Sequence, residues 1–276
     1  MKNKIVVFSN CHGEKYIDIF KKNSNIHELF DIEYLVSYEL LDNFSNVKET
    51  FESADILIMN NIKTYNDFTV SNLKSLMKPN SKLIVIPFVR FNGYWLPENY
   101  KKLKNFSANT VEQFPDIKIT EVKDYLNCCH DSEKIIDNYN EALMKLKSIE
   151  SESDIQFFDW FIDNHLKYPM FRDYKHPTSN LIEYVGNEIM KLIQVHCPLV
   201  HISSKLIFKN DLYEYGHYKP INDSVKTILN IEYDIDKIFV CSRENYLYNI
   251  LKHEETNILI QNLDDMKVKL IFDKCK

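Results

Sequence analysis

Glycine is scarce in this chain of 276 residues, which contains only Gly13, Gly93, Gly186 and Gly216. The abundance of Lys, Asn, Ile and Tyr indicates the composition bias of an AT-rich genome, which explains most of this scarcity. A bias against glycine retains it mainly where the backbone needs it, so each remaining glycine is informative. Gly13 draws attention first, because it closes the polar stretch Ser9-Asn10-Cys11-His12-Gly13 directly after an apolar run.

The sequence also lacks an excess of positive charge, a long apolar run and a regular cysteine framework. A net charge of −6 argues against a general nucleic-acid or membrane-surface binder, which would need a dominant basic face. No segment approaches the roughly 20 apolar residues of a membrane span, and the N-terminal run is too short for a signal peptide. The six cysteines are irregularly spaced. We therefore predict a cytoplasmic protein with reduced thiols, no nucleic-acid partner and no membrane span.

The first ninety residues alternate between strand-like and helical segments. Runs rich in Ile and Val predict strands over 5–8, 32–36, 55–59 and 82–86, and helical segments cover 14–22, 46–53 and 65–77. Such alternation is typical of a parallel sheet with helices on both faces. The sequence thus predicts an α/β fold with a Rossmann- or flavodoxin-like sheet.

The pattern changes after Pro87. The aromatic segment PFVRFNGYWLPENY is too irregular for a helix, and it precedes a helix-rich second half with helices predicted over 132–148, 154–165 and 179–195. The mixed C-terminal segment combines strand-like pieces (199–202, 237–241, 268–272) with helical ones (224–230, 244–252). We therefore expect a catalytic domain over 1–198 and a C-terminal accessory segment over 199–276.

Ligands of open parallel sheets bind beyond the carboxyl ends of the strands. Here those ends are Ser9–Gly13, Asn60 with Asn61, and Pro87–Trp95. Cys11 lies between a predicted strand and the start of a helix, whose partial positive charge and unpaired N–H groups would lower the pKa of a thiol. Gly13 would let a ligand approach the backbone. The alternative is that Cys11 is a small buried hydrophobic residue at a turn.

A second group of polar residues surrounds His176. Pro177, Thr178 and Ser179 follow it and predict the start of a helix, so His176 is expected on the preceding loop. Asp173 stands three residues upstream, close enough to orient the imidazole. A histidine held by a carboxylate is the usual form of a general base. The alternative is a polar loop that only caps the helix.

The order of these motifs resembles the SGNH hydrolase superfamily. Asp173-Tyr174-Lys175-His176-Pro177 matches its Asp-x-x-His-Pro block, and Asn60 or Asn61 loosely matches its oxyanion-hole asparagine. Cys11 stands where that superfamily has its serine, which is a departure.

The chain resembles WcbI-type polysaccharide biosynthesis acetyltransferases more closely. The shared motifs are Asn10-Cys11-His12, the aromatic segment from Pro87 to Pro97, and His176-Pro177-Thr178, and the resemblance spans roughly residues 4–195. It implies coenzyme A binding and O-acetylation of a capsular or other surface polysaccharide precursor. Alternatives are an SGNH-like esterase or thioesterase, and a non-catalytic module that binds coenzyme A or a nucleotide.

Within that resemblance, Cys11, His176 and Asp173 are the catalytic candidates. Cys11 either carries the acetyl group or lines the pocket while His176 deprotonates the sugar hydroxyl directly. Asn10, Gly13 and Asn60 are candidates to stabilise the oxyanion or position the reactants. Coenzyme A needs cations for its phosphates and an aromatic or apolar wall. Candidates for its site are His12, Lys15, Arg90, Tyr94, Trp95, Arg172 and Lys175.

A metal site is not predicted. Cys128, Cys129 and His130 contain metal-ligating side chains, but adjacent cysteines rarely fit a tetrahedral zinc site and no CxxC pair accompanies them. The aromatic run over 154–171 is explained by core packing, with a ring wall for the acceptor sugar as a secondary option.

Overall fold

The computed structural model describes residues 2–21, 24–40, 43–97, 128–193 and 221–233. The chain divides into two compact units. The first unit contains Met1–Val89, Leu146–Trp160 and Leu181–His201, and the second contains Arg90–Lys145, Phe161–Asn180 and Ile202–Lys276. The predicted boundary at 198/199 and the predicted elements at 199–202, 237–241, 244–252 and 268–272 lie outside the described residues.

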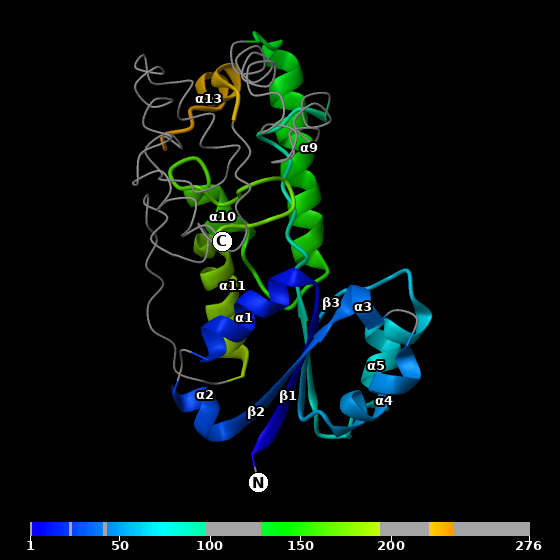
Figure 1. Cartoon of the computed structure of the whole chain (residues 1–276). Helices are drawn as coiled ribbons and strands as arrows, with labels where there is room; N and C mark the ends of the chain where they lie inside the picture. The colour runs from blue at the N-terminus through cyan, green and yellow to red at the C-terminus, as the bar shows by residue number, and fades with distance from the viewer. Residues whose placement is uncertain (1, 22–23, 41–42, 98–127, 194–220, 234–276) are drawn as a thin grey trace, which may run out of the picture. The chain divides into compact units, whose positions relative to one another are not determined.

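A parallel sheet with the strand order β2-β1-β3-β4 organises the first unit (Figure 1). Its strands are β1 (Asn3–Ser9), β2 (Phe30–Val36), β3 (Ile56–Asn60) and β4 (Lys82–Ile86). The central strands β1 and β3 are almost wholly buried, as expected for strands covered on both faces. The four predicted strands and the predicted α/β class are confirmed.

One face of the sheet packs against α4 (Phe44–Ser53), the short 3-10 helix η1 (Asn66–Phe68) and α5 (Val70–Leu76). The Phe8 ring lies 5.3 Å from that of Phe51 and 5.1 Å from that of Phe68, measured between centroids. The single helix predicted over 65–77 is wrong, because Thr69 interrupts it. Thr69 has an extended backbone, and its side chain accepts the N–H of Asn72 to begin a new helix.

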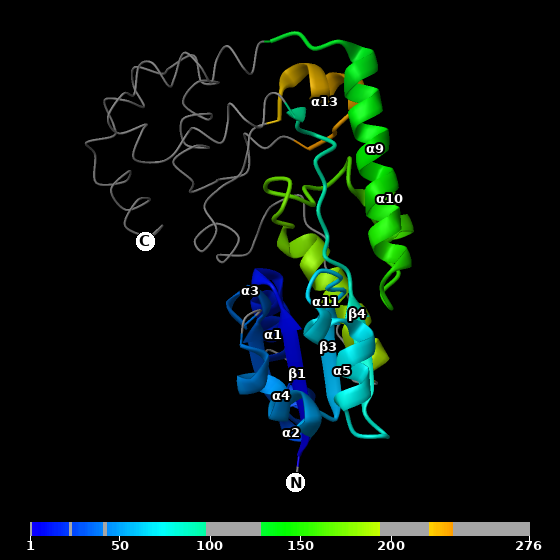
Figure 2. The same ribbon diagram turned by 90° about the vertical axis from the view of Figure 1, so that its right-hand side faces the viewer.

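The opposite face is covered by α1 (Cys11–Lys21), α2 (Ser24–Leu29) and the part of α11 (Ser179–Leu192) that belongs to this unit. Figures 1 and 2 show these helices across the sheet from α4 and α5. A Cβ at Gly186 of α11 would lie 2.9 Å from Cδ1 of Ile19, so the glycine lets α11 approach α1 closely. The sequence did not predict α2 or the four-residue helix α3 (Ser37–Leu40).

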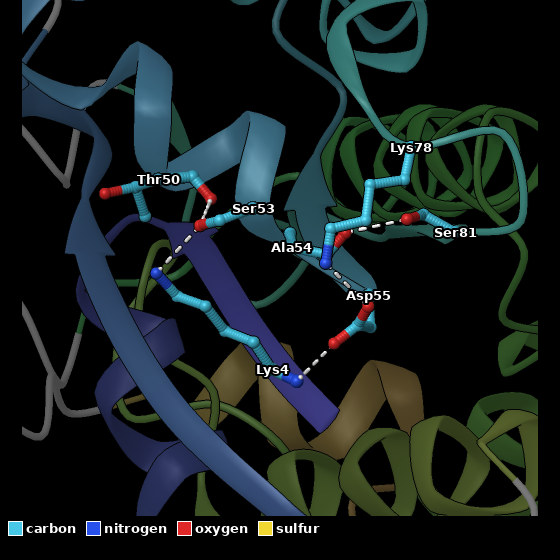
Figure 3. A network of polar contacts seen from close by, with 7 residues as sticks. All are labelled: Lys4, Thr50, Ser53, Ala54, Asp55, Lys78 and Ser81. Atoms are coloured by element: carbon cyan, nitrogen blue, oxygen red, sulfur yellow. Dashed lines mark hydrogen bonds and ion pairs between the residues drawn. The ribbon is translucent and has the colours of Figure 1, made fainter. Parts of the chain in front are cut away.

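Charged side chains join the amino ends of the strands (Figure 3). The Asp55 carboxylate accepts the backbone N–H of Lys4 at 2.7 Å and the ammonium of Lys78 at 2.9 Å. The Lys4 ammonium donates to Ser53 Oγ at 3.1 Å, and Ser81 Oγ donates to the Ala54 carbonyl at 2.7 Å. This amino-edge network fixes the entries to β1, β3 and β4.

The outer edge of β4 is paired with the chain after α9 (Ser132–Ser151). Asp154 donates its N–H to the Val85 carbonyl at 2.8 Å and accepts the Val85 N–H through Oδ2 at 2.7 Å. These bonds protect the edge strand from pairing with another chain. They also delay the next helix, so α10 (Phe158–Asn164) begins four residues after the predicted start at 154. Glu150 accepts the N–H groups of Phe157 and Phe158 at this start.

Aromatic side chains form the core of the second unit. The Phe91 ring lies 4.9 Å from Tyr94, 5.2 Å from Phe161 and 5.8 Å from Phe171, measured between centroids. The N–H of Phe91 also donates to the Tyr174 carbonyl at 3.0 Å, which joins the segment after β4 to the loop that carries His176. Asn222 caps the start of the helix α13 (Asp223–Leu229), and its side chain accepts the N–H of Ser224.

Candidate functional site

Two buried polar side chains meet at the carboxyl ends of β1 and β3. These strands are neighbours at the point where the strand order reverses, which is where ligands bind in open parallel sheets. Ser9 Oγ donates to Asn60 Oδ1 at 2.6 Å, and the Asn10 N–H donates to the same oxygen at 3.3 Å. Asn60 Nδ2 donates to the Ile86 carbonyl at 3.4 Å. Asn60 therefore ties together the ends of three strands.

Asn10 starts the helix that carries Cys11. Its side-chain oxygen accepts the N–H of His12 at 3.0 Å, and its carbonyl accepts the N–H of Gly13 at 2.8 Å. These bonds cap the helix, which begins at Cys11 rather than at the predicted residue 14. Cys11 is thus the first helical residue, partly exposed and reduced, next to the positive end of the helix.

Gly13 is explained by a neighbouring ring. A Cβ at this position would lie 2.5 Å from Cε2 of Tyr34 and 2.8 Å from Cβ of Ser9. The sequence predicts that the missing side chain of Gly13 admits a ligand, but in the structure the Tyr34 ring occupies the space beside the glycine. The glycine lets β2 and the first turn of α1 approach each other.

Tyr34 was not singled out from the sequence, although it belongs to this site. Its hydroxyl donates to the Asn10 carbonyl at 2.6 Å. Burial raises the pKa of Tyr34, and electrostatic interactions with the neighbouring ionisable groups raise it further, so the hydroxyl remains a donor. Only the strand order places β2 beside β1 here, and that order is not visible in the sequence.

In the second unit, Asp173 and His176 form the contact that the sequence predicts. His176 Nδ1 lies 2.9 Å from Oδ1 and 2.8 Å from Oδ2 of Asp173. The same carboxylate accepts the backbone N–H groups of Lys175 and His176. Burial raises the pKa of Asp173, but the bonds and charge of His176 and the two backbone donors outweigh burial and lower it overall.

Hydrogen bonds before and after the Asp173–His176 pair fix the conformation of its loop. Arg172 donates its N–H to the His176 carbonyl at 2.9 Å, and a bridge joins Phe171 to Pro177. Thr178 Oγ1 donates to the Pro169 carbonyl at 2.7 Å. The helix α11 then begins at Ser179, so the prediction of a loop directly before a helix is confirmed.

The predicted cofactor residues of the first unit are both largely covered. The His12 ring is buried, with its centroid 5.7 Å from that of Phe88. Lys15 Nζ lies 3.9 Å from an Asp18 oxygen on the same helix. Both residues lie in the first turns of α1, on the same helix as Cys11.

The predicted cofactor residues of the second unit fall into two groups. Arg90 and Lys175 are exposed, and Lys175 Nζ lies 5.0 Å from the centre of the Tyr174 ring. Arg172, Tyr94 and Trp95 are buried, and the Tyr94 hydroxyl donates to the His165 carbonyl at 2.7 Å. Exposed cations are accessible to a phosphate, whereas the contacts of Tyr94 are those of a core residue. The roles of all five residues stay predictions.

His165 forms a second histidine contact that the sequence did not predict. Its Nδ1 lies 2.9 Å from the Phe161 carbonyl and 3.0 Å from the Ile162 carbonyl, which assigns the proton to Nδ1. Nε2 then accepts the Tyr139 hydroxyl at 2.5 Å. Burial lowers the pKa of His165, so the ring is neutral and acts in packing.

The described part of the chain holds no group of three His, Cys, Asp or Glu side chains that could bind a metal. Cys128 and Cys129 are exposed. In the same ranges, no helix combines the length and the apolar character needed to cross a membrane.

Comparisons with known proteins agree with these motifs. The model of a family described as polysaccharide biosynthesis enzyme WcbI matches residues 4–197. A solved structure matches with a TM-score of 0.59 and 12% identity, covering 100% of this chain and 99% of the other. It is described as WcbI, a novel polysaccharide biosynthesis enzyme, in a native form without a disulfide bond between coenzyme A and one of its cysteines. No curated protein matches. At 12% identity, the similarity to this solved structure shows the fold of the chain alone.

Proposed function

Because the chain belongs to the WcbI family of polysaccharide biosynthesis enzymes, we propose that it is a coenzyme A-dependent O-acetyltransferase. Its substrates would be acetyl-CoA and a hydroxyl of a capsular or other surface polysaccharide precursor, in the cytoplasm. The observation that carries this proposal is the Asp173–His176 pair, since acetylating a hydroxyl requires a base. The coenzyme A named for the solved WcbI structure supports the choice of co-substrate.

His176 is the proposed general base. The Asp173 carboxylate accepts a hydrogen bond from the Nδ1–H, and in this tautomer the lone pair of the imidazole is on Nε2. The lowered pKa of Asp173 keeps this partner ionised near neutral pH. The His176 side chain is about one-third exposed, so a sugar hydroxyl can reach the ring edge.

In the proposed reaction, the hydroxyl oxygen attacks the carbonyl carbon of the thioester. A C–O bond forms, the C–S bond of acetyl-CoA breaks, the hydroxyl proton passes to His176 Nε2, and the thiolate of coenzyme A leaves. Negative charge develops on the carbonyl oxygen, and the N–H of Cys11, at the start of the turn Cys11–Gly13, is the proposed donor to it. Loss of one such donor typically raises the barrier by about 3–4 kcal/mol.

Cys11 has two possible roles in this scheme. Its thiolate could accept the acetyl group from coenzyme A by thioester exchange and then lose it to the sugar hydroxyl. Alternatively, Cys11 only lines the pocket beside the thiol of coenzyme A. The phosphates would be held by cations, for which Arg90 and Arg172 are the first choices and His12, Lys15 and Lys175 the next.

The experiment compares acetyl transfer to glycan acceptors with coenzyme A affinity measured by calorimetry. His176→Gln should lower kcat by roughly 10²–10⁴-fold, because the base is lost, and leave the Kd of coenzyme A unchanged. His130→Gln, at another partly exposed histidine of the same unit, is the matched control and should keep full activity. Unchanged kcat in His176→Gln would exclude the proposed base.

Further measurements separate the alternatives. Near wild-type activity in both Cys11→Ser and Cys11→Ala would exclude the covalent role of Cys11. Rapid release of acetate from acetyl-CoA without an acceptor would indicate a thioesterase. Tight coenzyme A binding without turnover of any acceptor would indicate a binding module.

A further inference from the structure

The structure assigns the Tyr34 hydroxyl a role as a positioning group for the Cys11 turn. We propose that this hydroxyl polarises the Asn10–Cys11 peptide group and so strengthens the Cys11 N–H as a donor to the substrate. This inference rests on the proposed function, in which the Cys11 N–H donates to the developing negative charge.

The Asn10 carbonyl accepts two hydrogen bonds. One comes from the Gly13 N–H at 2.8 Å and closes the first helical turn, and the other comes from Tyr34 Oη at 2.6 Å. This carbonyl belongs to the same peptide group as the Cys11 N–H. Donors to a carbonyl increase the double-bond character of its C–N bond and make its N–H a stronger donor.

The Cys11 N–H is available for such a bond. Across the described ranges, the hydrogen bonds at this turn use the N–H groups of Asn10, His12 and Gly13, and none uses that of Cys11. It is among the first N–H groups of α1, which have no partner within the helix. The partial positive charge of the helix end adds to its attraction for an anion.

Tyr34 is held in place independently of any ligand. Its backbone pairs with Val7 of β1, and its ring fills the space beside Gly13. Burial, with a smaller contribution from neighbouring ionisable groups, raises the pKa of the hydroxyl, so it donates rather than accepts at neutral pH. Replacement by phenylalanine removes the donor and keeps the ring.

Tyr38 offers a matched control. Tyr38 also interacts electrostatically with Cys11 and Glu14, but this residue is 59% exposed. Tyr38→Phe therefore removes a hydroxyl from the same surroundings without changing the bond to Asn10. We expect it to keep the properties of the wild type.

The first measurement needs no activity. Selective ¹⁵N-cysteine labelling of the full chain gives one amide signal for each of its six cysteines, and Cys11→Ser identifies the signal of Cys11. In Tyr34→Phe, we expect this ¹⁵N resonance to move to lower frequency, because the peptide group loses a donor at its carbonyl. In Tyr38→Phe, it should stay in place. An unmoved Cys11 resonance in Tyr34→Phe, or an equal shift in both variants, overturns the proposal.

The second measurement uses steady-state kinetics with coenzyme A calorimetry. Tyr34→Phe should lower kcat by about threefold to tenfold, the effect of one hydrogen bond, with the Kd of coenzyme A unchanged. Equal losses in kcat and coenzyme A affinity would indicate a general structural defect and overturn the positioning role. If the wild type shows no transfer at all, the proposed function fails, while the Cys11 resonance still decides whether Tyr34 polarises the peptide group.

Discussion

The two ends of the parallel sheet are joined by different kinds of polar contact. At the amino ends, Lys4, Asp55 and Lys78 carry charge, and the side chains of Asp55 and Lys78 are 34% and 49% exposed (Figure 3). At the carboxyl ends, Ser9 and Asn60 are neutral and almost wholly buried, with 0% and 5% exposure. Each set of contacts connects β1 to β3 and β4. The set at the carboxyl ends differs in lying beside Cys11 and the start of α1.

This difference indicates what each end contributes. Exposed ion pairs typically contribute little to stability, because water and salt screen them. A buried neutral hydrogen bond contributes a modest net amount, but removing one partner leaves the other unsatisfied at a larger cost. The carboxyl end is therefore the more sensitive to substitution, and its geometry fixes the backbone from Ser9 to Gly13.

The largest effect on stability is expected for Asn60→Ala. The change removes the Asn60 acceptor from the buried Ser9 hydroxyl, which keeps only a long contact of 3.4 Å to Asn10 Oδ1, and from the partly buried Asn10 N–H. Each buried unsatisfied donor costs about 1–3 kcal/mol, so the free energy of unfolding should fall by about 3 kcal/mol. Lys78→Ala at the opposite end should lower it by less than about 1 kcal/mol. Urea unfolding of both variants measures the two losses.

A double variant tests whether the unsatisfied donors cause the loss of stability in Asn60→Ala. Ser9→Ala in the Asn60→Ala background removes one of the two orphaned donors, so it should recover part of the lost stability. Equal losses in Asn60→Ala and Lys78→Ala would show that the two ends of the sheet are energetically alike.

An intermediate effect is expected for Gly13→Ala. The added Cβ would meet both the Tyr34 ring and Ser9 Cβ at under 3.0 Å, and neither can move without disturbing β1 or β2. Such overpacking costs about 2 kcal/mol, more than the gain in helix propensity.

Gly186→Ala is the control for Gly13→Ala, since both glycines lie in helices. The new Cβ at Gly186 would come closer than 3.0 Å to one atom, the flexible Cδ1 tip of Ile19, so the variant should stay within about 1 kcal/mol of the wild type. Thermal unfolding measures both, and a stable Gly13→Ala would mean that the Tyr34 ring can leave this space.

Much of the fold could be predicted because it depends on local patterns. The runs rich in Ile and Val are strands, and β4 has its predicted bounds of Lys82–Ile86. The single helix predicted over 65–77 was wrong, because Thr69 caps a new helix there. In the sequence alone, a threonine at this position is equally compatible with a continuous helix. The start of α10 was wrong for a tertiary reason, because Asp154 pairs with Val85.

The candidate site was predictable only in part. The contact between Asp173 and His176 follows from a spacing of three residues on one loop, so the sequence contains it. The contacts of Asn60 with Ser9 and of Tyr34 with Asn10 depend on strand order. Gly13 was recognised as special, but the reason, a ring from another strand, is visible only in three dimensions.

The smallest effect is expected for Asp55→Asn, and it should depend on pH. The N–H of Lys4 and then the Lys78 ammonium lower the pKa of Asp55. A carboxyl with a lowered pKa stabilises the fold above its unfolded-state pKa of about 4, and that contribution is lost as the pH falls through the folded-state value. The difference between wild type and Asp55→Asn should thus reach up to about 1 kcal/mol near pH 7 and shrink in acid and in high salt. Urea unfolding across this pH range tests it, and a pH-independent difference would show that the carboxylate charge does not hold this end of the sheet.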